Sequence, residues 1–337
     1  MREAMLYEPL ASGKVRCELC RHYCVIADGR DGICRVRANV GGTLYTLVYG
    51  RAIAANVDPI EKKPLFHFHP GSRSYSIATA GCNFQCAFCQ NWDISQMPKG
   101  GRRLAGRWFP PEAVVAAALA TGCASIAYTY TEPTIFFEYA YDTAQLAHEA
   151  GLKNVFVSNG YMTEKALRRI APYLDAINVD VKGFSEARYK RVMKARLQPV
   201  LESLHVIKAL GIWLEVTTLV IPTISDDEAG LRGIAAAIVD LDAGTPWHVT
   251  QFHPDYRLTE LPRTPLETLQ RARHLGLDAG LRYVYCGNVP GEEGENTFCW
   301  GCGALLIERW GYRTKVIGLR EGACGRCGSK IDGAGLP

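Results

Sequence analysis

The sequence lacks any long hydrophobic run, since no apolar stretch in its 337 residues reaches the length of about 18 that can cross a bilayer. It also lacks a strong excess of one charge, because the net charge of +4 is too small to indicate nucleic-acid binding by itself. The first ten residues contain acids and Pro9 in place of an apolar core, so we expect no secretory signal. We therefore expect a soluble, cytoplasmic globular protein without a membrane span.

Cysteine, by contrast, is abundant, with 13 residues in the chain. In a reducing compartment such a number indicates metal ligands more than disulfides. Four cysteines lie near the N-terminus, three in one loop of the first third of the chain and four near the C-terminus. The two others, Cys123 and Cys286, lie at a predicted helix end and in a strand-like run, and we interpret them as packing residues.

The three central cysteines, Cys82, Cys86 and Cys89, have the spacing C-x3-C-x2-C and follow an apolar run, 75–80, that predicts a buried strand. A loop of this kind can wrap a 4Fe-4S cluster, in which three thiolates leave the fourth iron open to a substrate or cofactor. The alternative is three buried cysteines that only pack. The spacing, the strand and the aromatic Phe88 together favour the cluster.

With Phe88 before its last cysteine, this motif resembles the signature of radical S-adenosylmethionine (SAM) enzymes, in the branch that contains pyruvate formate-lyase activating enzymes. The resemblance implies that SAM chelates the open iron through its amino and carboxylate groups. It also implies that an electron from the cluster cleaves the sulfonium, and that the resulting 5'-deoxyadenosyl radical abstracts hydrogen. Cys82, Cys86 and Cys89 are then the catalytic cluster ligands. The loop residues expected beside the cofactor are Phe88, Gln90 and Asn91.

From residue 74 to about 290, short apolar runs alternate with helical patterns, which predicts an α/β fold with a parallel sheet. Pro111 opens a predicted helix over 111–120, and residues 225–228 have capping-box spacing before another. The resemblance implies a partial (β/α)6 barrel, whose catalytic groups gather at the C-terminal ends of the strands. The predicted strands are 74–80, 125–131, 154–158, 176–181, 212–221, 247–252 and a possible seventh, 282–286.

The second predicted strand ends in Thr131, Glu132 and Pro133. The resembled activases carry Gly-Gly-Glu-Pro here and hold the amino group of SAM with it; in this chain Tyr130 and Thr131 replace the glycines. The alternative for Glu132 is a solvated carboxylate at a strand end.

The third strand ends in Ser158, Asn159 and Gly160, which is similar to the Thr-Asn-Gly turn that meets the ribose in the family. Hydroxyl and amide side chains at this position suit a sugar diol. Taken alone, Ser-Asn-Gly indicates only a turn.

The later strand ends supply further polar candidates. Asp180 and Lys182 match the family's Asp-x-Lys and share one face of a strand, where Lys182 can pair with a cofactor carboxylate or form a structural salt bridge. Glu215 is a candidate inward polar group of the fifth strand. His253, held extended before proline, matches a histidine that contacts SAM in the activases.

Both ends of the chain contain a set of four cysteines. The N-terminal set, on glycine-rich turns, can close a tetrahedral zinc site or hold an auxiliary iron-sulfur cluster. The C-terminal set forms two C-x2-C-G knuckles around a β-like stretch, which predicts a zinc ribbon, although a rubredoxin-like iron site has the same ligands. The two sets are Cys17, Cys20, Cys24 and Cys34, and Cys299, Cys302, Cys324 and Cys327.

These features predict an N-terminal metal-binding and β domain over 1–72, a barrel over 73–290 and a zinc-ribbon-like domain over 291–337. His67 and His69 at the first boundary can be metal ligands, but strand alternation favours a structural role. The whole arrangement resembles the radical SAM protein of the AmmeMemoRadiSam system. The partners so implied are Memo-like and AMMECR-like proteins, and an electron donor such as flavodoxin or ferredoxin.

Two classes of function follow from these motifs. The first is a radical SAM oxidoreductase with an unidentified substrate, and within it a glycyl-radical-enzyme activase is one alternative. The second is a metal-rich module that docks a protein or nucleic acid and has an inactive barrel. The intact cysteine motif favours the enzyme.

Overall fold

The computed structural model describes residues 1–100, 104–289 and 291–337. The chain forms two compact units. Unit 1 contains residues 1–58 and 73–177, and unit 2 contains residues 59–72 and 178–337. None of the helices in the described part of the chain is long and apolar enough to span a membrane.

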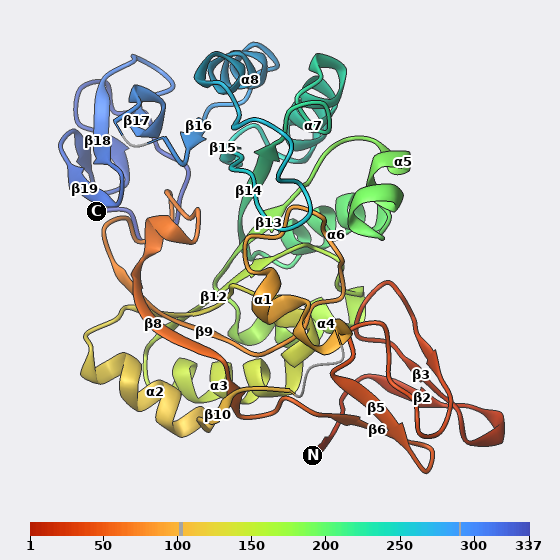
Figure 1. Cartoon of the computed structure of the whole chain (residues 1–337). Coiled ribbons are helices and arrows are strands. Elements are labelled where there is room, and N and C mark those ends of the chain that lie inside the picture. Colours follow the sequence, from red (N-terminus) through yellow and green to blue (C-terminus); the bar gives the residue numbers. More distant parts are fainter. Residues whose placement is uncertain (101–103, 290) are drawn as a thin grey trace. The chain divides into compact units, whose positions relative to one another are not determined.

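Unit 1 is built on parallel strands joined by helices (Figure 1). β9 (Arg73–Ala78), β11 (Ser125–Tyr128) and β12 (Lys153–Ser158) pair in parallel in the order β12-β11-β9, and β8 (Ala54–Pro59) follows β9 at the edge. All three predicted strands are confirmed, although β9 and β11 end before the polar residues. β11 is buried throughout, as the continuous apolar runs of a parallel sheet require.

The helices of unit 1 pack on these strands. α2 (Pro111–Ala120) has the predicted bounds and begins at Pro111, whose fixed φ suits the first helical position. α2 and α3 (Phe137–Glu149) pack on each other and on β11. Thr163 caps α4 (Glu164–Ile170) by accepting a 3.2 Å hydrogen bond from the Ala166 N–H. The remaining α-helix of this unit is α1 (Trp92–Ser95).

Short antiparallel strands make up the N-terminal part of unit 1. They pair in the orders β1-β6-β5, β2-β3-β4 and β10-β7. The bounds are β1 Arg2–Glu3, β2 Tyr7–Pro9, β3 Val15–Cys17, β4 Val25–Ile26, β5 Arg37–Val40, β6 Thr43–Thr46, β7 Arg51–Ala52 and β10 Arg107–Trp108.

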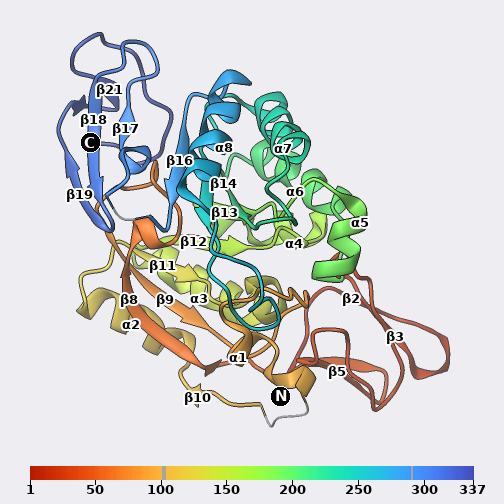
Figure 2. The same ribbon diagram turned by 45° about the horizontal axis from the view of Figure 1, so that its top comes forward.

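Unit 2 continues the alternation of strands and helices (Figure 2). β14 (Trp213–Val220), β15 (Trp247–Gln251) and β16 (Val284–Gly287) pair in parallel, and β13 (Ala176–Asp180) lies where unit 2 begins. All four match predicted strands. α8 packs on β15 and β16, and α6 packs on β14. The helices are α5 Glu186–Arg188, α6 Gln198–Ala209, α7 Glu228–Leu241 and α8 Leu266–Asp278.

The predicted capping box before α7 is wrong in its capping residue. Asp227, not Ser225, accepts the 2.9 Å hydrogen bond from the Gly230 N–H. Ser225 instead closes the turn before the helix, since its hydroxyl accepts from Ile221 N and donates to Leu219 O, both at 2.8 Å. An aspartate immediately before the first helical residue has the better position for the cap.

The C-terminal part of unit 2 is antiparallel, with strand orders β17-β18-β19 and β20-β21. Its apolar residues Leu306 and Ile307 join one buried cluster with Phe66 and Tyr285, so residues 59–72 and the end of the chain share a core with β16. The bounds are β17 Thr297–Phe298, β18 Leu305–Trp310, β19 Arg313–Val316, β20 Leu319–Arg320 and β21 Ala323–Cys324.

Candidate active site and metal centres

The central cysteines lie on the loop that leaves β9 and ends in α1. Residues after the loop hold its backbone in place. Lys99 Nζ and Gln96 Nε2 donate to the Phe84 carbonyl oxygen at 2.6 and 3.3 Å, and the Phe84 N–H donates to Cys82 Sγ at 3.3 Å. Backbone donors to sulfur are typical of loops that carry thiolate ligands.

The three thiols have different surroundings. Cys86 is buried, whereas Cys82 and Cys89 are partly exposed, and Cys89 Sγ lies 3.2 Å from Ser95 Oγ. Burial raises the pKa of Cys82 well above its ordinary value, and the Lys99 ammonium opposes that shift. A metal bound by this thiol would therefore have to displace its proton.

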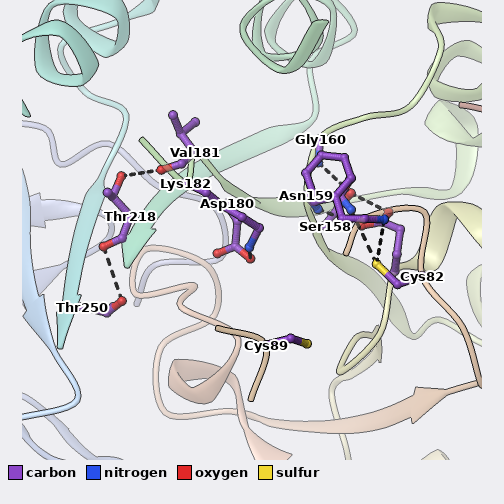
Figure 3. A network of polar contacts seen from close by, with 12 residues as sticks. Cys82, Cys89, Ser158, Asn159, Gly160, Asp180, Val181, Lys182, Thr218 and Thr250 are labelled. Carbon is purple, nitrogen blue, oxygen red and sulfur yellow. Dashed lines mark hydrogen bonds and ion pairs between the residues drawn. The ribbon is translucent and has the colours of Figure 1, made fainter. Parts of the chain in front are cut away.

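Asn159 connects the end of β12 to the cysteine loop (Figure 3). Its Nδ2 donates to Asn83 Oδ1 at 2.7 Å and lies 3.9 Å from Cys82 Sγ, while its Oδ1 accepts from the Tyr161 N–H. The structure thus brings Asn159 and Cys82 together, although they are 77 positions apart in the sequence.

Glu132 organises two strand ends from a fully buried position. Its Oε1 accepts hydrogen bonds from the Thr134 N–H, the Thr134 hydroxyl at 2.6 Å and the Ser158 hydroxyl at 2.8 Å. Its Oε2 accepts from the Asn159 N–H at 2.8 Å. Burial raises the pKa of Glu132, and these hydrogen bonds oppose the shift. Glu132 is not the solvated carboxylate of the alternative interpretation; it positions Ser158 and Asn159.

Tyr130 takes the left-handed conformation, with φ of 60°, at one of the two positions where the activases carry glycine. The turn keeps the backbone geometry that glycine adopts most readily. The hydroxyl of Tyr130 donates to Asp58, and the Thr131 hydroxyl donates to the Thr79 carbonyl at 2.9 Å. These two bonds fix the side chains that replace the glycines.

In unit 2, Lys182 Nζ donates to Asp180 Oδ2 at 2.7 Å, which confirms that the two side chains share a face of the strand end (Figure 3). The Thr218 hydroxyl donates to the Val181 carbonyl between them at 2.9 Å. His253 follows β15 and is partly exposed, and burial together with Arg263 lowers its pKa. A neutral imidazole is therefore its form near neutral pH.

The other loop residues differ in exposure. Phe88 is buried and Gln90 is exposed, while Asn91 lies at the start of α1, where its carbonyl accepts from the Ser95 N–H at 2.9 Å. Pro133 is buried at the start of a short 3-10 turn. Sequence patterns missed Asn83, Lys99 and Tyr130, because their roles depend on contacts that no local motif encodes.

Glu215 and His67 belong to a buried network of unit 2. The Glu215 carboxylate accepts from His248 Nε2, from Trp213 Nε1 and from two backbone N–H groups, those of Phe66 and His67. His67 uses both ring nitrogens, with Nδ1 at 2.6 Å from the Asp332 carbonyl and Nε2 at 2.5 Å from the Tyr285 hydroxyl. The structural interpretation of His67 is confirmed.

The C-terminal cysteines form a compact metal centre. The four sulfur atoms, of Cys299, Cys302, Cys324 and Cys327, all lie within 4.8 Å of one another, and two pairs are 3.6 and 3.7 Å apart. A tetrahedron with Zn–S bonds of about 2.3 Å requires sulfur separations of about 3.8 Å. Ser329 lowers the pKa of Cys327 to about 6, so this thiol ionises readily. The set fits one tetrahedral metal ion.

Comparisons with known proteins agree with this geometry. Residues 76–231 match the family model of the radical SAM superfamily. Over 335 residues the chain is 48% identical to uncharacterized protein MJ0808 of Methanocaldococcus jannaschii, with 98% of this chain and 99% of that protein covered. A match of 96 residues is 30% identical to the isethionate sulfite-lyase activating enzyme of Nitratidesulfovibrio vulgaris, covering 28% of this chain and 31% of that enzyme.

Among solved structures, a radical SAM methyltransferase from Sphaerobacter thermophilus is similar in fold, with a TM-score of 0.52, 14% identity and 71% of each chain covered. Residues 76–231 of this chain thus form a radical SAM superfamily domain. The predicted α/β radical SAM fold with a cysteine-rich C-terminal part is thereby confirmed.

Proposed function

We propose that this chain is an enzyme that holds a 4Fe-4S cluster on Cys82, Cys86 and Cys89 and uses it to cleave SAM. One observation carries the proposal. The three cysteines occupy one loop at the end of the parallel strand β9 inside the matched domain, and Asn159, at the end of β12 on the far side of β11, reaches that loop. When bound, the cluster supplies the electron that cleaves the sulfonium of SAM, and the 5'-deoxyadenosyl radical abstracts hydrogen from the substrate.

The donor set fits the cluster. Three thiols leave one iron without a protein ligand, and that iron is where SAM binds. Among the described residues, the three sulfur atoms do not crowd within 4.8 Å of one another as the C-terminal set does. Wider spacing suits a cluster in which each thiolate binds a different iron.

The protein's own residues bind and orient the cofactor. Glu132 fixes the Asn159 backbone and the Ser158 hydroxyl at one strand end. These amide and hydroxyl groups would meet the ribose of SAM, as the family resemblance implies, and their fixed positions would orient the cofactor. The roles that the family resemblance implies for Asp180, Lys182 and His253 stay predictions. Lys182 already pairs with the Asp180 carboxylate. Binding of a cofactor carboxylate would therefore exchange one carboxylate partner of the lysine for another.

The proposal also assigns the C-terminal metal, the type of radical SAM protein, its partners and its electron donor. We infer zinc at the C-terminal centre, since four thiols at tetrahedral spacing suit it. We also infer a radical SAM protein of the AmmeMemoRadiSam type, with Memo-like and AMMECR-like partners and a flavodoxin or ferredoxin as electron donor. The support for this assignment is the order of the three cysteine sets along the chain.

A glycyl-radical-enzyme activase is the second candidate. The sequence match to the isethionate sulfite-lyase activating enzyme favours it over part of the chain. An activase would leave a glycyl radical on a partner enzyme, and electron spin resonance would detect that radical only after incubation with active protein and SAM. Absence of such a signal with every glycyl-radical partner tested removes this candidate.

The main proposal is tested by SAM cleavage. The protein is purified without oxygen, reconstituted with iron and sulfide and reduced with dithionite, and 5'-deoxyadenosine is measured by mass spectrometry. We expect product from the parent chain and from Cys123→Ala, whose thiol lies outside the three sets, and none from Cys86→Ala. Equal product from Cys86→Ala would refute the assignment. No product from a fully loaded parent chain, with or without partner proteins, would favour the docking module.

A further inference from the structure

The four N-terminal cysteines surround one small cavity of unit 1. Cys17 ends β3, Cys20 and Cys24 follow on the next turns, and Cys34 precedes β5. Cys17 and Cys34 are buried and the other two are partly exposed. The remaining lining is mostly apolar and includes Leu19, Ile26, Ile33 and Ile135. Four thiols around one apolar cavity indicate a metal site more than a set of unrelated packing residues.

The spacing of these thiols differs from that of the C-terminal set. Within the described residues, Cys299, Cys302, Cys324 and Cys327 form a group with all sulfur atoms inside 4.8 Å, and the N-terminal cysteines do not. A single zinc ion requires the closer spacing, because one ion binds all four sulfurs. In a cubane, each thiolate binds a separate iron and the sulfurs lie farther apart.

Arg37 adds an independent observation. Its side chain lines the cavity and is 2% exposed. One of its terminal nitrogens donates to both oxygens of Glu138, at 2.8 and 2.9 Å, but its Nε is buried without a hydrogen-bond partner. Buried donors rarely stay unsatisfied, so this N–H points to an acceptor that the protein itself does not supply. Cluster sulfides and metal-bound thiolates are acceptors of this kind, so this N–H supports a metal–sulfur site here, and the choice between zinc and a cluster rests on the sulfur spacing.

The cavity lies directly beside the loop of the first cluster. A Cβ placed on Gly81 would lie 3.3 Å from the Cys34 carbonyl oxygen, so the Cα of Cys82 is at most about 9 Å from that oxygen. His22 Nε2 lies 2.9 Å from the Asn83 carbonyl oxygen, and Asn83 lines the cavity with a buried Nδ2 that has no partner.

We propose that Cys17, Cys20, Cys24 and Cys34 hold a second 4Fe-4S cluster, which passes an electron to the first. The assignment of a cluster to these four cysteines does not depend on the proposed function. The electron transfer to the first cluster does rest on the proposed function. A reduced flavodoxin- or ferredoxin-type donor gives up one electron and is oxidised by one. The second cluster takes up that electron and returns to its oxidised state when it reduces the cluster on Cys82, Cys86 and Cys89 by one electron.

Metal analysis tests the second site without a measurement of enzyme activity. The full chain in which Cys82, Cys86 and Cys89 are all changed to alanine is reconstituted, and its iron and zinc are measured together with its Mössbauer spectrum. We expect about four irons per chain as a cubane. Its electron spin resonance signal after reduction should not respond to SAM. Iron should be lost when Cys20→Ala and Cys24→Ala are added, and the C-terminal zinc serves as the folding control.

Two results would overturn the proposal. One is about two zinc ions and no cubane in the triple variant, which assigns the N-terminal site to zinc. The other is a cubane that persists after Cys20→Ala and Cys24→Ala. Either result leaves SAM cleavage by the parent chain unaffected, so failure here is distinguishable from failure of the proposed function.

Electron transfer is tested by changing the reductant. In the Cys20→Ala chain, the ratio of flavodoxin-driven to dithionite-driven 5'-deoxyadenosine formation should fall well below that of the parent chain, because dithionite, as a small reductant, reaches either cluster directly. Cys123→Ala, which removes a buried thiol away from both sites, should keep the parent ratio. An unchanged ratio in Cys20→Ala contradicts the electron transfer.

Discussion

Glu132 shows how one buried side chain holds several others. Its carboxylate accepts four hydrogen bonds that join the ends of β11 and β12. We expect Glu132→Ala to lower the free energy of unfolding by about 2–4 kcal/mol, because it leaves buried donors unpaired. Glu132→Gln keeps one acceptor oxygen and should cost less. Urea denaturation monitored by circular dichroism measures both, and equal stability of the alanine variant and the parent would contradict this role.

His67 makes the stability of unit 2 depend on pH. Its Nδ1 carries the hydrogen, because the Asp332 carbonyl can only accept, so its Nε2 accepts from the Tyr285 hydroxyl. Burial lowers the pKa of His67 from 6.5 to about 4. The unfolded chain therefore takes up this proton first as the pH falls. We expect a loss of up to about 3 kcal/mol in the free energy of unfolding between pH 6.5 and 4, and no further loss from His67 below that range.

The measurement is a series of urea unfolding curves across this pH range. His67→Gln should flatten the profile between pH 6.5 and 4, whereas His274→Gln, at an exposed position, should not change it. Glu215, whose pKa is lowered because His248 and His67 outweigh the effect of burial, adds its own loss as the pH falls below its unfolded value of 4.5, at the acidic end of this range and beyond it. A parent profile that is flat over the His67 window would rule out this origin of acid sensitivity.

Individual roles were the hardest feature to predict from the sequence. The cysteines carry their chemistry in their spacing, and Glu132 and Asn159 occupy recognisable strand ends. Arg37 and Asn83 carry no such signal, because their importance comes from partners far along the chain, such as Glu138 and Asn159. Only the folded chain shows which buried donors are left unpaired.

A helix or strand could be predicted where a short stretch of sequence alone determines it. Continuous apolar runs located β9, β11, β12 and the strands of unit 2, because parallel strands are buried on both faces. Pro111 fixed the start of α2. The error at α7 arose because the sequence offers a capping box at Ser225 and an aspartate at position 227, and only tertiary contacts decide between them.

The cap of α7 gives a test of that correction. Asp227→Ala should lower the free energy of unfolding by about 1 kcal/mol, because the Gly230 N–H loses its acceptor. Loss of the partly exposed Arg188 pair adds about 0–1 kcal/mol. Asp227→Asn keeps a capping oxygen and should retain most of the stability. Equal unfolding midpoints for the alanine variant and the parent would contradict the assigned cap.

We expect the C-terminal strands to depend on the proposed zinc centre for their stability. Cys327→Ala removes one of the four ligands, so we expect the zinc content, about one ion per chain at this site, to fall and the thermal unfolding temperature to decrease. Cys286→Ala removes a buried thiol outside the set and should keep the zinc. Full zinc retention by Cys327→Ala, measured by plasma mass spectrometry, would contradict the proposed ligand set.

The whole chain combines one matched domain with a set of four cysteines on either side of it in the sequence. The matched residues 76–231 contain the central cysteines, and the relative from Methanocaldococcus jannaschii extends the similarity over nearly the full length. The fold class was predictable because its strands and cysteine motif are both local signals. The substrate was not, since the residues proposed to bind SAM say little about what donates the hydrogen atom.

The most direct test of the central claim is whether SAM binds the open iron. The electron spin resonance spectrum of the reduced, reconstituted protein is recorded before and after SAM is added. We predict that SAM changes the signal of the parent chain and leaves the spectrum of Cys86→Ala unchanged. A parent cluster that forms fully and gives the same spectrum with and without SAM would contradict a radical SAM mechanism for this chain.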